Sequence, residues 1–392
     1  MRIGIECESI EGKNPIWGIG RIIMKLLEEI SRRPELEKNF RFVLYFKDSV
    51  PDFEFLKAPV FEKKCVPAPF VRGRLFPIYY FALLPLKLWF EKLDLMFWPN
   101  YMLPIIAWGS KNMVVLTEDI WHEMHEGKLP FRYRLAYGIF GWWTAKFATK
   151  IMAISESSKN EVSKLFKINP ERIAVNHLGV NLDKQIANGQ WPIAISPKPL
   201  AQTKDSNYLL FVGQSFPRRH LKETLEAFEQ IAPQFPDIKL VAIGPDKYDT
   251  PTVAPLVEKI NKNLGRQAIT HQNYLTDEEL LSHYQSAKGL IYVSDREAFG
   301  LPPMEALTYG VPSIVADMPL THELFGERTF YVRPELVEGQ QKITANAIAA
   351  QMRELLTNSS KVEQIKKSAP QIVSKYTWSK FTDRWVNIIR RV

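Results

Sequence analysis

Short apolar runs alternate with amphipathic stretches along most of the 392-residue chain. Brief apolar runs predict buried strands, and apolar residues spaced three and four apart predict helices with one buried face. A strand followed by a helix and another strand is the repeating unit of parallel α/β sheets. The pattern therefore predicts an α/β fold from end to end. In the first half the expected strands are residues 2–8, 40–46, 93–98, 112–116 and 150–154, and a helix is expected at 20–31.

The second half repeats this alternation. Two sequences have the spacing of a capping box, in which a hydroxyl and a glutamate three residues later satisfy the first amides of a helix. Ser158 and Glu161 form one and predict a short helix from Ser158 onward, and Thr276 and Glu279 form the other. The expected strands are 208–212, 238–243, 289–293 and 312–316, and the expected helices are 221–232, 255–264, 276–287 and 302–309, with three more helical segments at the end of the chain.

The periodicity stops between residues 183 and 207, where Gly, Pro, Gln, Ser and Lys dominate. Such a composition is typical of a linker. We therefore predict a first domain at residues 1–182, a linker at 183–207 and a second domain at 208–375. The helix at 376–392 is expected to cross back to the first domain. A chain of this length is suited to two domains.

Composition and cysteine content point to a globular cytoplasmic protein. Hydrophobic residues make up 46% and charged residues 24% of the chain, which is an ordinary globular balance. Cys7 and Cys65 have neither a disulfide framework nor metal-ligand spacing around them. The first residues already have the pattern of a buried strand, so no signal peptide is expected. The longest apolar run, 76–86, is too short to span a membrane.

The net charge of +8 comes mainly from residues 1–180, which carry 26 Lys and Arg against 20 Asp and Glu. A basic surface favours phosphorylated ligands, anionic lipid or nucleic acid, and the absence of zinc-finger and aromatic RNA-binding motifs argues against nucleic acid. Two stretches, 70–90 and 131–143, mix aromatic with basic residues. Such residues either pack in a core or lie in a bilayer interface. Core packing is favoured for 131–143, and both interpretations stay open for 70–90.

The strongest chemical signal lies in residues 293–312, where a strand ends, a loop crosses and a helix begins. Open α/β sheets bind ligands at the carboxyl ends of their strands. Pro302 and Pro303 suit a first helical turn, where amide hydrogens lack intrahelical partners. The amides of Phe299, Gly300 and Leu301, together with the helix dipole, form a site suited to a pyrophosphate.

Two carboxylates flank this site. Glu297 lies in the loop and Glu305 in the first turn of the helix, and each can accept hydrogen bonds from the hydroxyls of a sugar or ribose ring. Two glutamates at this spacing also occur by chance on solvated helices. The interpretation as a ligand site therefore rests on their position between a strand and a helix.

The pattern Glu-x7-Glu around Phe-Gly-Leu-Pro, followed by Gly-Val-Pro, resembles the donor-site signature of family 4 glycosyltransferases, which are retaining enzymes of the GT-B fold. The resemblance covers nearly the whole chain and is strongest in residues 208–332. It implies two Rossmann-like, doubly wound domains facing an interdomain cleft. It also implies that Glu297 holds the donor sugar, Glu305 the nucleotide ribose, and the amides of 299–301 the diphosphate.

Three further segments resemble motifs of the same family. Residues 213–220 are similar to a loop whose basic side chains neutralise the donor phosphates, and they place Arg218 and Arg219 in that role. The Gly-x-Gly at 18–20 resembles the family's glycine loop, although a plain tight turn would explain it too. Residues 273–280 resemble the segment beneath the nucleotide base. The ligand-binding residues implied here are Gly18, Gly20, Gly213, Tyr274 and Leu275.

The chain departs from the family after the strand at 112–116, where a His-Asp pair is common and Glu118-Asp119 stands instead. A carboxylate beside a departing phosphate is unfavourable unless it binds the acceptor or is protonated. Asp119 matches the family and either orients the acceptor or caps the following helix.

The resemblance thus implies a retaining hexosyltransferase of polysaccharide biosynthesis. Its donor would be GDP-mannose or a UDP-hexose, and its acceptor a saccharide or lipid-linked saccharide. Arg218, Arg219 and the loop amides would stabilise the leaving diphosphate without a metal or other cofactor. The alternatives are a non-catalytic sugar-nucleotide-binding or scaffold protein, and an epimerase or phosphorylase on the same fold. The expected location is the cytoplasm, with peripheral contact to the inner face of the membrane as an open possibility.

Overall fold

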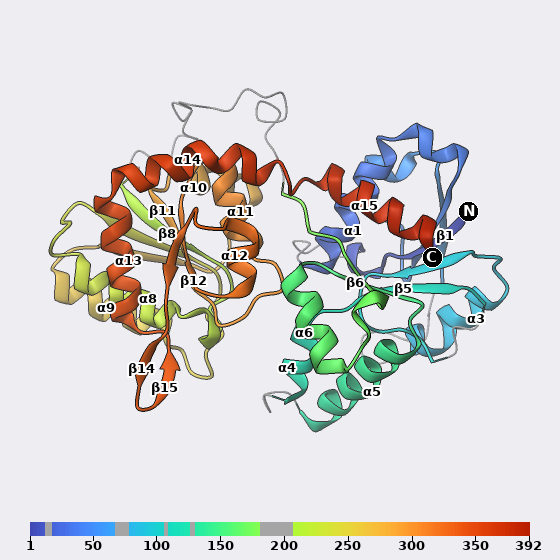
Figure 1. Ribbon diagram of the computed structural model, residues 1–392, viewed down its shortest axis with the longest axis horizontal. Coiled ribbons are helices and arrows are strands. Elements are labelled where there is room, and N and C mark those ends of the chain that lie inside the picture. Colours follow the sequence, from blue (N-terminus) through green and yellow to red (C-terminus); the bar gives the residue numbers. More distant parts are fainter. Residues whose placement is uncertain (12–17, 67–77, 106–108, 126–129, 181–206) are drawn as a thin grey trace. The chain divides into compact units, whose positions relative to one another are not determined.

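The computed structural model describes residues 1–11, 18–66, 78–105, 109–125, 130–180 and 207–392. The chain divides into two compact units (Figure 1). Unit 1 comprises Met1–Gly179 and Trp378–Val392, and unit 2 comprises Val180–Thr377. The linker expected at 183–207 lies outside the described residues, apart from Asn207.

Unit 1 is built on a seven-stranded parallel sheet with the strand order β3-β2-β1-β4-β5-β6-β7. Its central strands are almost continuously apolar and buried, as expected for a sheet with helices on both faces. The strands are β1 (Arg2–Glu6), β2 (Arg41–Phe46), β3 (Phe61–Cys65), β4 (Leu95–Trp98), β5 (Lys111–Val115), β6 (Lys150–Ala153) and β7 (Ile173–Val175). The helices are α1 (Ile19–Ser31), α3 (Leu84–Trp89), α4 (Asp119–His125), α5 (Phe131–Phe147), α6 (Glu156–Phe166) and α15 (Trp378–Arg391).

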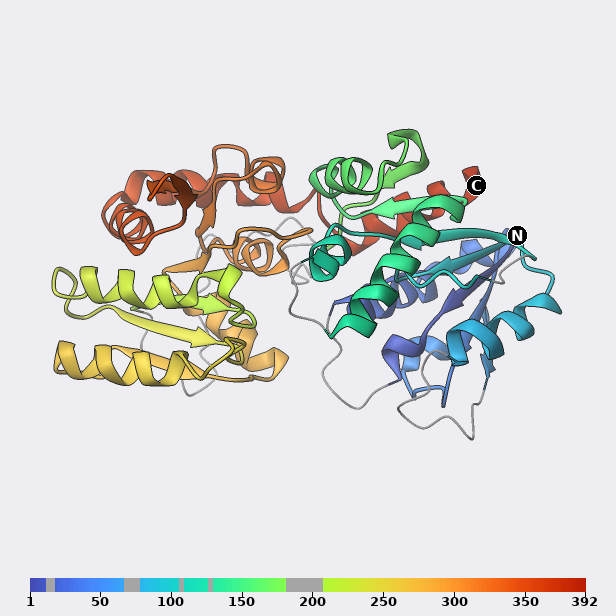
Figure 2. The ribbon, with the colours of Figure 1, turned by 90° about the horizontal axis from the view of Figure 1, so that it is seen from below.

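Unit 2 repeats the architecture with six parallel strands in the order β10-β9-β8-β11-β12-β13. Helices cover both faces of this sheet (Figure 2). Its strands are β8 (Tyr208–Val212), β9 (Lys239–Ile243), β10 (Ile269–Gln272), β11 (Gly289–Tyr292), β12 (Ser313–Ala316) and β13 (Phe330–Val332), with a hairpin of β14 (Glu335–Val337) and β15 (Gln340–Lys342). Its helices are α8 (Leu221–Ile231), α9 (Val253–Leu264), α10 (Asp277–Ser286), α11 (Leu301–Thr308), α12 (Pro319–Phe325), α13 (Ala345–Thr357) and α14 (Ser359–Val373).

Every strand and helix expected from the sequence is present, with ends that differ by a few residues at most. The hairpin of β14 and β15 was not expected, and the unexpected strands of the two parallel sheets, β3, β7, β10 and β13, all lie at sheet edges. Edge strands are short and partly solvated, and β3 carries the polar sequence Glu62-Lys63-Lys64. Their apolar signal is therefore weaker than that of the central strands.

One predicted helix start is wrong. Helix α6 begins at Glu156, and its N-cap is Ser155, whose hydroxyl accepts the amide of Ser158 at 2.9 Å. Ser158 was expected to be the cap, but it lies inside the first turn, where its hydroxyl bonds to Glu118. The capping box at Thr276 and Glu279 is confirmed by both of its reciprocal hydrogen bonds.

The last helix, α15, belongs to the core of unit 1. In Figure 1 it lies beside α1, and its fully buried Trp385 contacts Phe42 of β2 and Phe97 of β4 at ring-centroid distances of 6.0 and 5.4 Å. Polar contacts support this packing, because Arg384 donates to Asn176 at 3.0 Å. Helix α15 therefore completes the core of unit 1, whose other elements come from Met1–Gly179.

We expect Trp385→Ala to lower the free energy of unfolding of unit 1 by about 3–5 kcal/mol, because it leaves a cavity among aromatic rings. Urea denaturation of the full chain measures this loss, with exposed Arg391→Ala as the control on the same helix. A loss below about 1 kcal/mol, the range of surface substitutions, would mean that α15 does not complete the core.

Candidate active site

The candidate site of unit 2 lies where the order of its strands reverses. Strands β8 and β11 are hydrogen-bonded neighbours, yet the connection from β8 runs toward β9 and the one from β11 runs toward β12. The loops that follow β8 and β11 therefore leave a crevice between them, which is where doubly wound sheets bind ligands. The first loop carries Arg218 and Arg219, and the second carries Glu297.

These three side chains meet in one cluster. Arg219 donates from Nε to Glu297 Oε1 at 2.9 Å and from Nη2 to Oε2 at 3.4 Å. Arg218 donates from Nη1 to the same Oε1 at 3.1 Å. All three side chains are less than one quarter exposed, so water screens these charges less than it would at an open surface. Two cations share one carboxylate, which leaves the cluster with a net charge of +1.

The backbone around the cluster makes room for it through glycine. Gly213, directly after β8, has φ +137°, and a Cβ there would lie 2.5 Å from Nη1 of Arg219. Any side chain at this position would therefore displace the guanidinium that holds Glu297. The role expected for Gly213 at the binding loop fits this close approach.

The loop after β11 leads into α11. Gly300 is the N-cap of this helix and has φ +81°, and Pro302 and Pro303 follow in the first turn. Since proline has no amide hydrogen, the donors available at this helix start come from the residues before Pro302. That is the position of the 299–301 amides. Phe299 itself is buried, with its ring 5.9 Å from that of Tyr376.

Glu305, the second glutamate of the Glu-x7-Glu pattern, lies on α11. Its Oε2 accepts a hydrogen bond from the hydroxyl of Tyr284, on α10, at 3.1 Å. Tyr284 is buried and packs in the core of unit 2, so it fixes where the carboxylate lies. No sequence motif marks this partner, because an inward-facing tyrosine on an amphipathic helix resembles any core residue.

A histidine that sequence reasoning had not singled out ties the two loops together. His220 follows Arg219, and its Nε2 lies 2.6 Å from Asp295 in the β11 loop, while its Nδ1 lies 3.5 Å from Glu223. Burial lowers the pKa of His220, but the hydrogen bonds and charges of both carboxylates outweigh it and raise the pKa to about 9. The imidazolium therefore persists at neutral pH and adds a cation beside the arginine pair.

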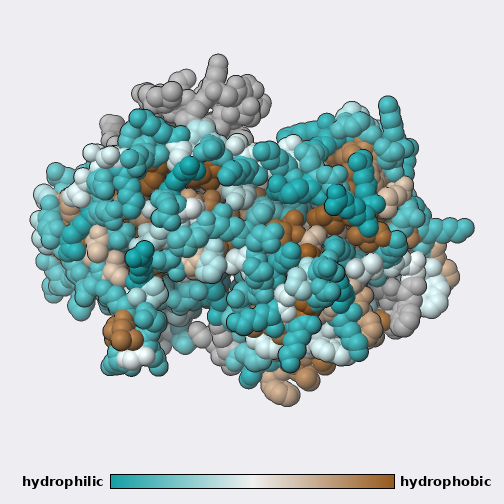
Figure 3. All heavy atoms as spheres, viewed as in Figure 1, coloured by the Kyte–Doolittle hydropathy of each residue, from teal (hydrophilic) through white to brown (hydrophobic). Residues whose placement is uncertain are grey.

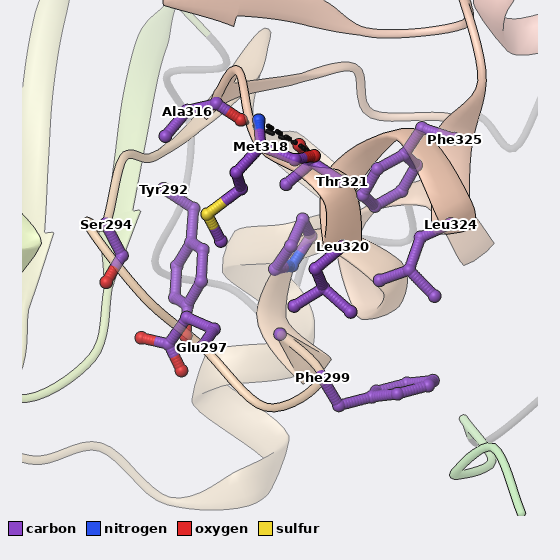
Figure 4. A pocket seen from close by; sticks show the side chains of 12 residues that line it. Tyr292, Ser294, Glu297, Phe299, Ala316, Met318, Leu320, Thr321, Leu324 and Phe325 are labelled. Atoms are coloured by element: carbon purple, nitrogen blue, oxygen red, sulfur yellow. Dashed lines mark hydrogen bonds between the residues drawn. The ribbon is translucent and has the colours of Figure 1, made fainter. Parts of the chain in front are cut away.

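A pocket opens beside the cluster (Figure 4). Glu297, Ser294 and Tyr292 lie on one side of it, and Leu320 and Leu324 of α12 face them from the other. Thr321 anchors α12 by donating to the carbonyl of Ala316 at 2.7 Å. The side with Glu297 thus offers one carboxylate and the hydroxyls of Tyr292 and Ser294 against an apolar wall, a combination suited to a ring with hydroxyls on one edge.

Tyr274 and Leu275 lie between β10 and α10 in the same unit. The Tyr274 side chain is exposed, and Leu275 packs against the core of unit 2. Within the described residues no group of three or more His, Cys, Asp or Glu side chains is placed so that it could hold a metal ion.

The remaining site residues lie in unit 1, at the carboxyl ends of its own strands. Gly18 precedes α1 with φ +55°, a conformation that disfavours other residues, and Gly20 is buried in the first turn. Asp119 is the first residue of α4, after β5. Glu118 beside it is 5% exposed, and its Oε2 accepts the hydroxyl of Ser158 at 2.5 Å.

Burial raises the pKa of Glu118 to about 7, although the hydrogen bond from Ser158 opposes the rise. A large share of this carboxyl is therefore protonated at neutral pH, which removes much of the repulsion expected between it and a phosphate. A second buried acid, Glu6 at the end of β1, was missed because it ends an apolar strand without a motif. Burial raises its pKa to about 8, and the amide of Glu8, which donates to it at 2.7 Å, opposes the rise.

Comparison with known proteins shows what this part of the chain is similar to. Residues 193–372 match the family described as glycosyl transferases group 1. This stretch makes up most of unit 2 and contains the whole arginine–glutamate cluster. Unit 2 belongs to the glycosyl transferases group 1 family. The family membership predicted from the Glu-x7-Glu segment is thereby confirmed.

Relatives in this glycosyltransferase family include bacterial mannosyltransferases. The chain is 28% identical over 201 residues to the serotype-specific mannosyltransferase WbdA of Escherichia coli, a match that covers 49% of this chain and 24% of that protein. It is 23% identical over 240 residues to the O-antigen chain mannosyltransferase RfbU of Salmonella typhimurium, covering 60% and 61% of the two chains. The matches thus span about a quarter and about three fifths of those relatives.

Solved structures extend the likeness to the whole chain. Anabaena HepE in complex with UDP-glucose superposes with a TM-score of 0.66 at 13% identity over 100% of both chains. Sucrose-phosphate synthase from Thermosynechococcus elongatus gives a TM-score of 0.70 at 15% identity, covering 100% of this chain and 98% of that one. At such identities the likeness shows the fold, and the predicted GT-B fold class is confirmed.

His220 gives this site a stability that depends on pH. Because its pKa is raised above the ordinary value of 6.5, its stabilisation is fully present below about pH 6.5 and is lost as pH rises through about 9. His220→Asn keeps a residue that tolerates the left-handed backbone, φ 50°, and removes the charge. We expect the wild type to unfold roughly 4–8 °C higher than this variant at pH 6, corresponding to about 2 kcal/mol. The gap should close near pH 10, and a gap independent of pH would contradict the imidazolium assignment.

Glu118 should have a pH dependence of the same sign. Its raised pKa means that the folded state favours the neutral acid, so its stabilisation is lost as pH rises from about 4.5 through about 7. Glu118→Gln stays neutral and should therefore gain on the wild type by about 1–2 kcal/mol between pH 5 and pH 8.5, measured by thermal unfolding. Glu6 titrates in both proteins and cancels in the difference. A constant difference across this range would show that Glu118 is ionised throughout.

Proposed function

We propose that the chain is a retaining hexosyltransferase that moves a hexose from GDP-mannose or a UDP-hexose to a saccharide or lipid-linked saccharide acceptor. One observation carries the proposal: Arg218 and Arg219 converge on Glu297 beside a helix start, within a family-matched unit. The mannosyltransferase relatives support mannose as the sugar, and the HepE complex supports a uridine donor. The acceptors that those relatives' names suggest belong to bacterial polysaccharide assembly.

The cluster suits a leaving diphosphate. When the bond from the anomeric carbon to the phosphate oxygen breaks, negative charge develops on that oxygen. Arg218, Arg219 and the amides at 299–301 supply positive charge and donors where it develops. The acceptor oxygen then bonds to the anomeric carbon on the same face, and its proton passes to the departing diphosphate.

Glu297 is proposed to do two things at once. It holds the two guanidinium groups in place, and it lines the pocket beside the cluster, where the donor sugar would bind (Figure 4). A carboxylate already bonded to cations still has lone pairs for one or two ring hydroxyls. Glu305, fixed by Tyr284, would receive the ribose hydroxyls on the other side of the diphosphate.

Asp119, Gly18 and Gly20 are proposed to serve the acceptor or the donor phosphates from unit 1. Asp119 follows β5 and Gly18 follows the β1 loop, so both lie at the ligand-binding edge of that sheet. The largely neutral Glu118 would then bind an acceptor hydroxyl without repelling a phosphate.

We expect Glu297→Ala to reduce transfer on the order of 10²–10³-fold, because it removes a sugar contact and releases both arginines. The assay measures nucleoside diphosphate released from GDP-mannose and from UDP-glucose, with methyl mannosides and glucosides as acceptors. Glu363→Ala, an exposed glutamate on α14 of the same unit, is the matched control and should keep full activity.

Near-normal turnover in Glu297→Ala would refute the assignment of this residue. If the wild type binds a nucleotide sugar but releases no diphosphate with any acceptor or water, the chain is a sugar-nucleotide-binding protein instead. Conversion of the donor sugar without an acceptor would indicate an epimerase.

A further inference from the structure

Helix α5 carries a row of large apolar side chains that face solvent. Phe131, Leu135, Ile139 and Trp142 are spaced four, four and three residues apart, which places them on one side of an α-helix. All four are exposed, Phe131 by 75% and Trp142 by 56%. With Lys146, the next position on that side, they form what we call the α5 stripe. It runs for most of the length of this 17-residue helix, about 25 Å.

The opposite side of α5 already packs against unit 1. Tyr137 stacks on Tyr101 at 5.2 Å, and a Cβ at Gly141 would lie 3.0 Å from the ring of Phe166. The prediction that residues 131–143 pack in the core is therefore right for one side of the helix and wrong for the other. A helix that is apolar on all sides is normally buried on all sides. The α5 stripe instead faces solvent, although its composition is typical of a buried surface.

A second exposed apolar row lies next to it. Leu86, Trp89 and Phe90, on α3 and directly after it, are exposed, with Phe90 at 84%. Tyr79, Tyr80 and Leu84 on the preceding turns are buried. Phe81, on the turn that leads into α3, stacks on Phe140 of α5 with ring centroids 4.3 Å apart, so the start of this segment adjoins α5. In Figure 3 apolar atoms appear along the lower edge of unit 1, over the position of α5 in Figure 1.

Charge completes the pattern. Residues 127–155 contain five Lys and Arg and no Asp or Glu. Lys146 lies on the stripe itself, exposed, with its Nζ 4.9 Å from the ring of Trp142. Lys87 is exposed beside Trp89 on α3. A protein partner with a matched surface would usually offer hydrogen bonds or acidic anchors, whereas aromatic rings with flexible lysines, on a helix without acids, suit a lipid interface. Glu91, which follows Phe90, is paired with Arg2 and Lys64.

We infer that the α5 stripe and the exposed row on α3 together bind the surface of an anionic lipid bilayer. The apolar side chains enter the boundary between headgroups and acyl chains, and the tryptophans lie at headgroup level. Lys146 and Lys87 contact the lipid phosphates, each adding attraction that salt weakens. No helix within the described residues has the length and apolar character needed to span a bilayer.

The test uses the purified full chain without substrate, so its outcome is separate from that of the proposed activity. Co-sedimentation with vesicles of phosphatidylcholine containing about 30% phosphatidylglycerol is compared with pure phosphatidylcholine vesicles. We expect binding to the anionic vesicles that falls with added salt and with loss of anionic lipid. Phe131→Ser/Trp142→Ser should weaken vesicle binding on the order of tenfold or more, because two aromatic side chains that would be buried in the lipid are lost.

Leu336→Ser/Leu281→Ser is the matched control, since it removes two exposed apolar residues from unit 2, one of them 70% exposed. It should bind vesicles as the wild type does. Lys146→Glu tests the charge without altering the apolar row and should weaken anionic binding while leaving thermal unfolding unchanged. If the double variant folds poorly, the binding of Lys146→Glu to anionic vesicles tests the inference instead.

Three results would overturn the inference. One is wild-type protein that stays in the supernatant with anionic vesicles. Another is equal binding by the wild type and Lys146→Glu. The third is a wild-type dimer that Phe131→Ser/Trp142→Ser converts to a monomer, which would make the stripe a contact between copies of this chain.

Discussion

The site of unit 2 depends on one shared carboxylate. Glu297 accepts hydrogen bonds from Arg218 and Arg219, which come from a loop almost 80 residues earlier in the chain. Without that carboxylate, two adjacent guanidinium groups in a partly buried crevice would repel each other and turn toward water. With it, both are held next to the start of α11 and retain a net positive charge. The strand order brings these loops together, because β8 and β11 are neighbours on either side of the point where the sheet reverses direction.

Much of this arrangement was predictable from sequence because it depends on local patterns. The strand-loop-helix setting of Glu297 and Glu305, the basic pair after β8 and the Thr276 capping box each lie within a short window. The strand order itself was not readable, and neither were contacts such as His220 with Asp295 or Tyr284 with Glu305, whose partners lie 75 and 21 residues apart. Ser158 shows the limit of a local pattern. Its capping-box spacing is genuine, but its hydroxyl bonds to Glu118, forty residues away, and Ser155 takes the cap.

Burial also changes the charge that a residue carries and the role that it can have. Glu118 looked unfavourable beside a phosphate when its charge was read from sequence alone. In the fold, burial leaves it largely neutral near pH 7, so the departure from the family's His-Asp pair no longer argues against transfer chemistry. The aromatic stretch at 131–143 shows the converse. Its composition favours a core helix, yet Phe131, Leu135, Ile139 and Trp142 on one side of it lie in solvent. Periodicity within an apolar helix cannot reveal which side the rest of the protein covers.

The most direct test of the central claim is a calorimetric titration of GDP and UDP into the full chain and into Arg219→Gln. If the shared-carboxylate cluster is the diphosphate site, one of the two diphosphates binds the wild type. Arg219→Gln then loses on the order of tenfold or more in affinity, since a charge-assisted pair of contacts is removed. The corresponding monophosphate should bind more weakly than the diphosphate. Equal affinities of the wild type and Arg219→Gln for the diphosphate would contradict the account.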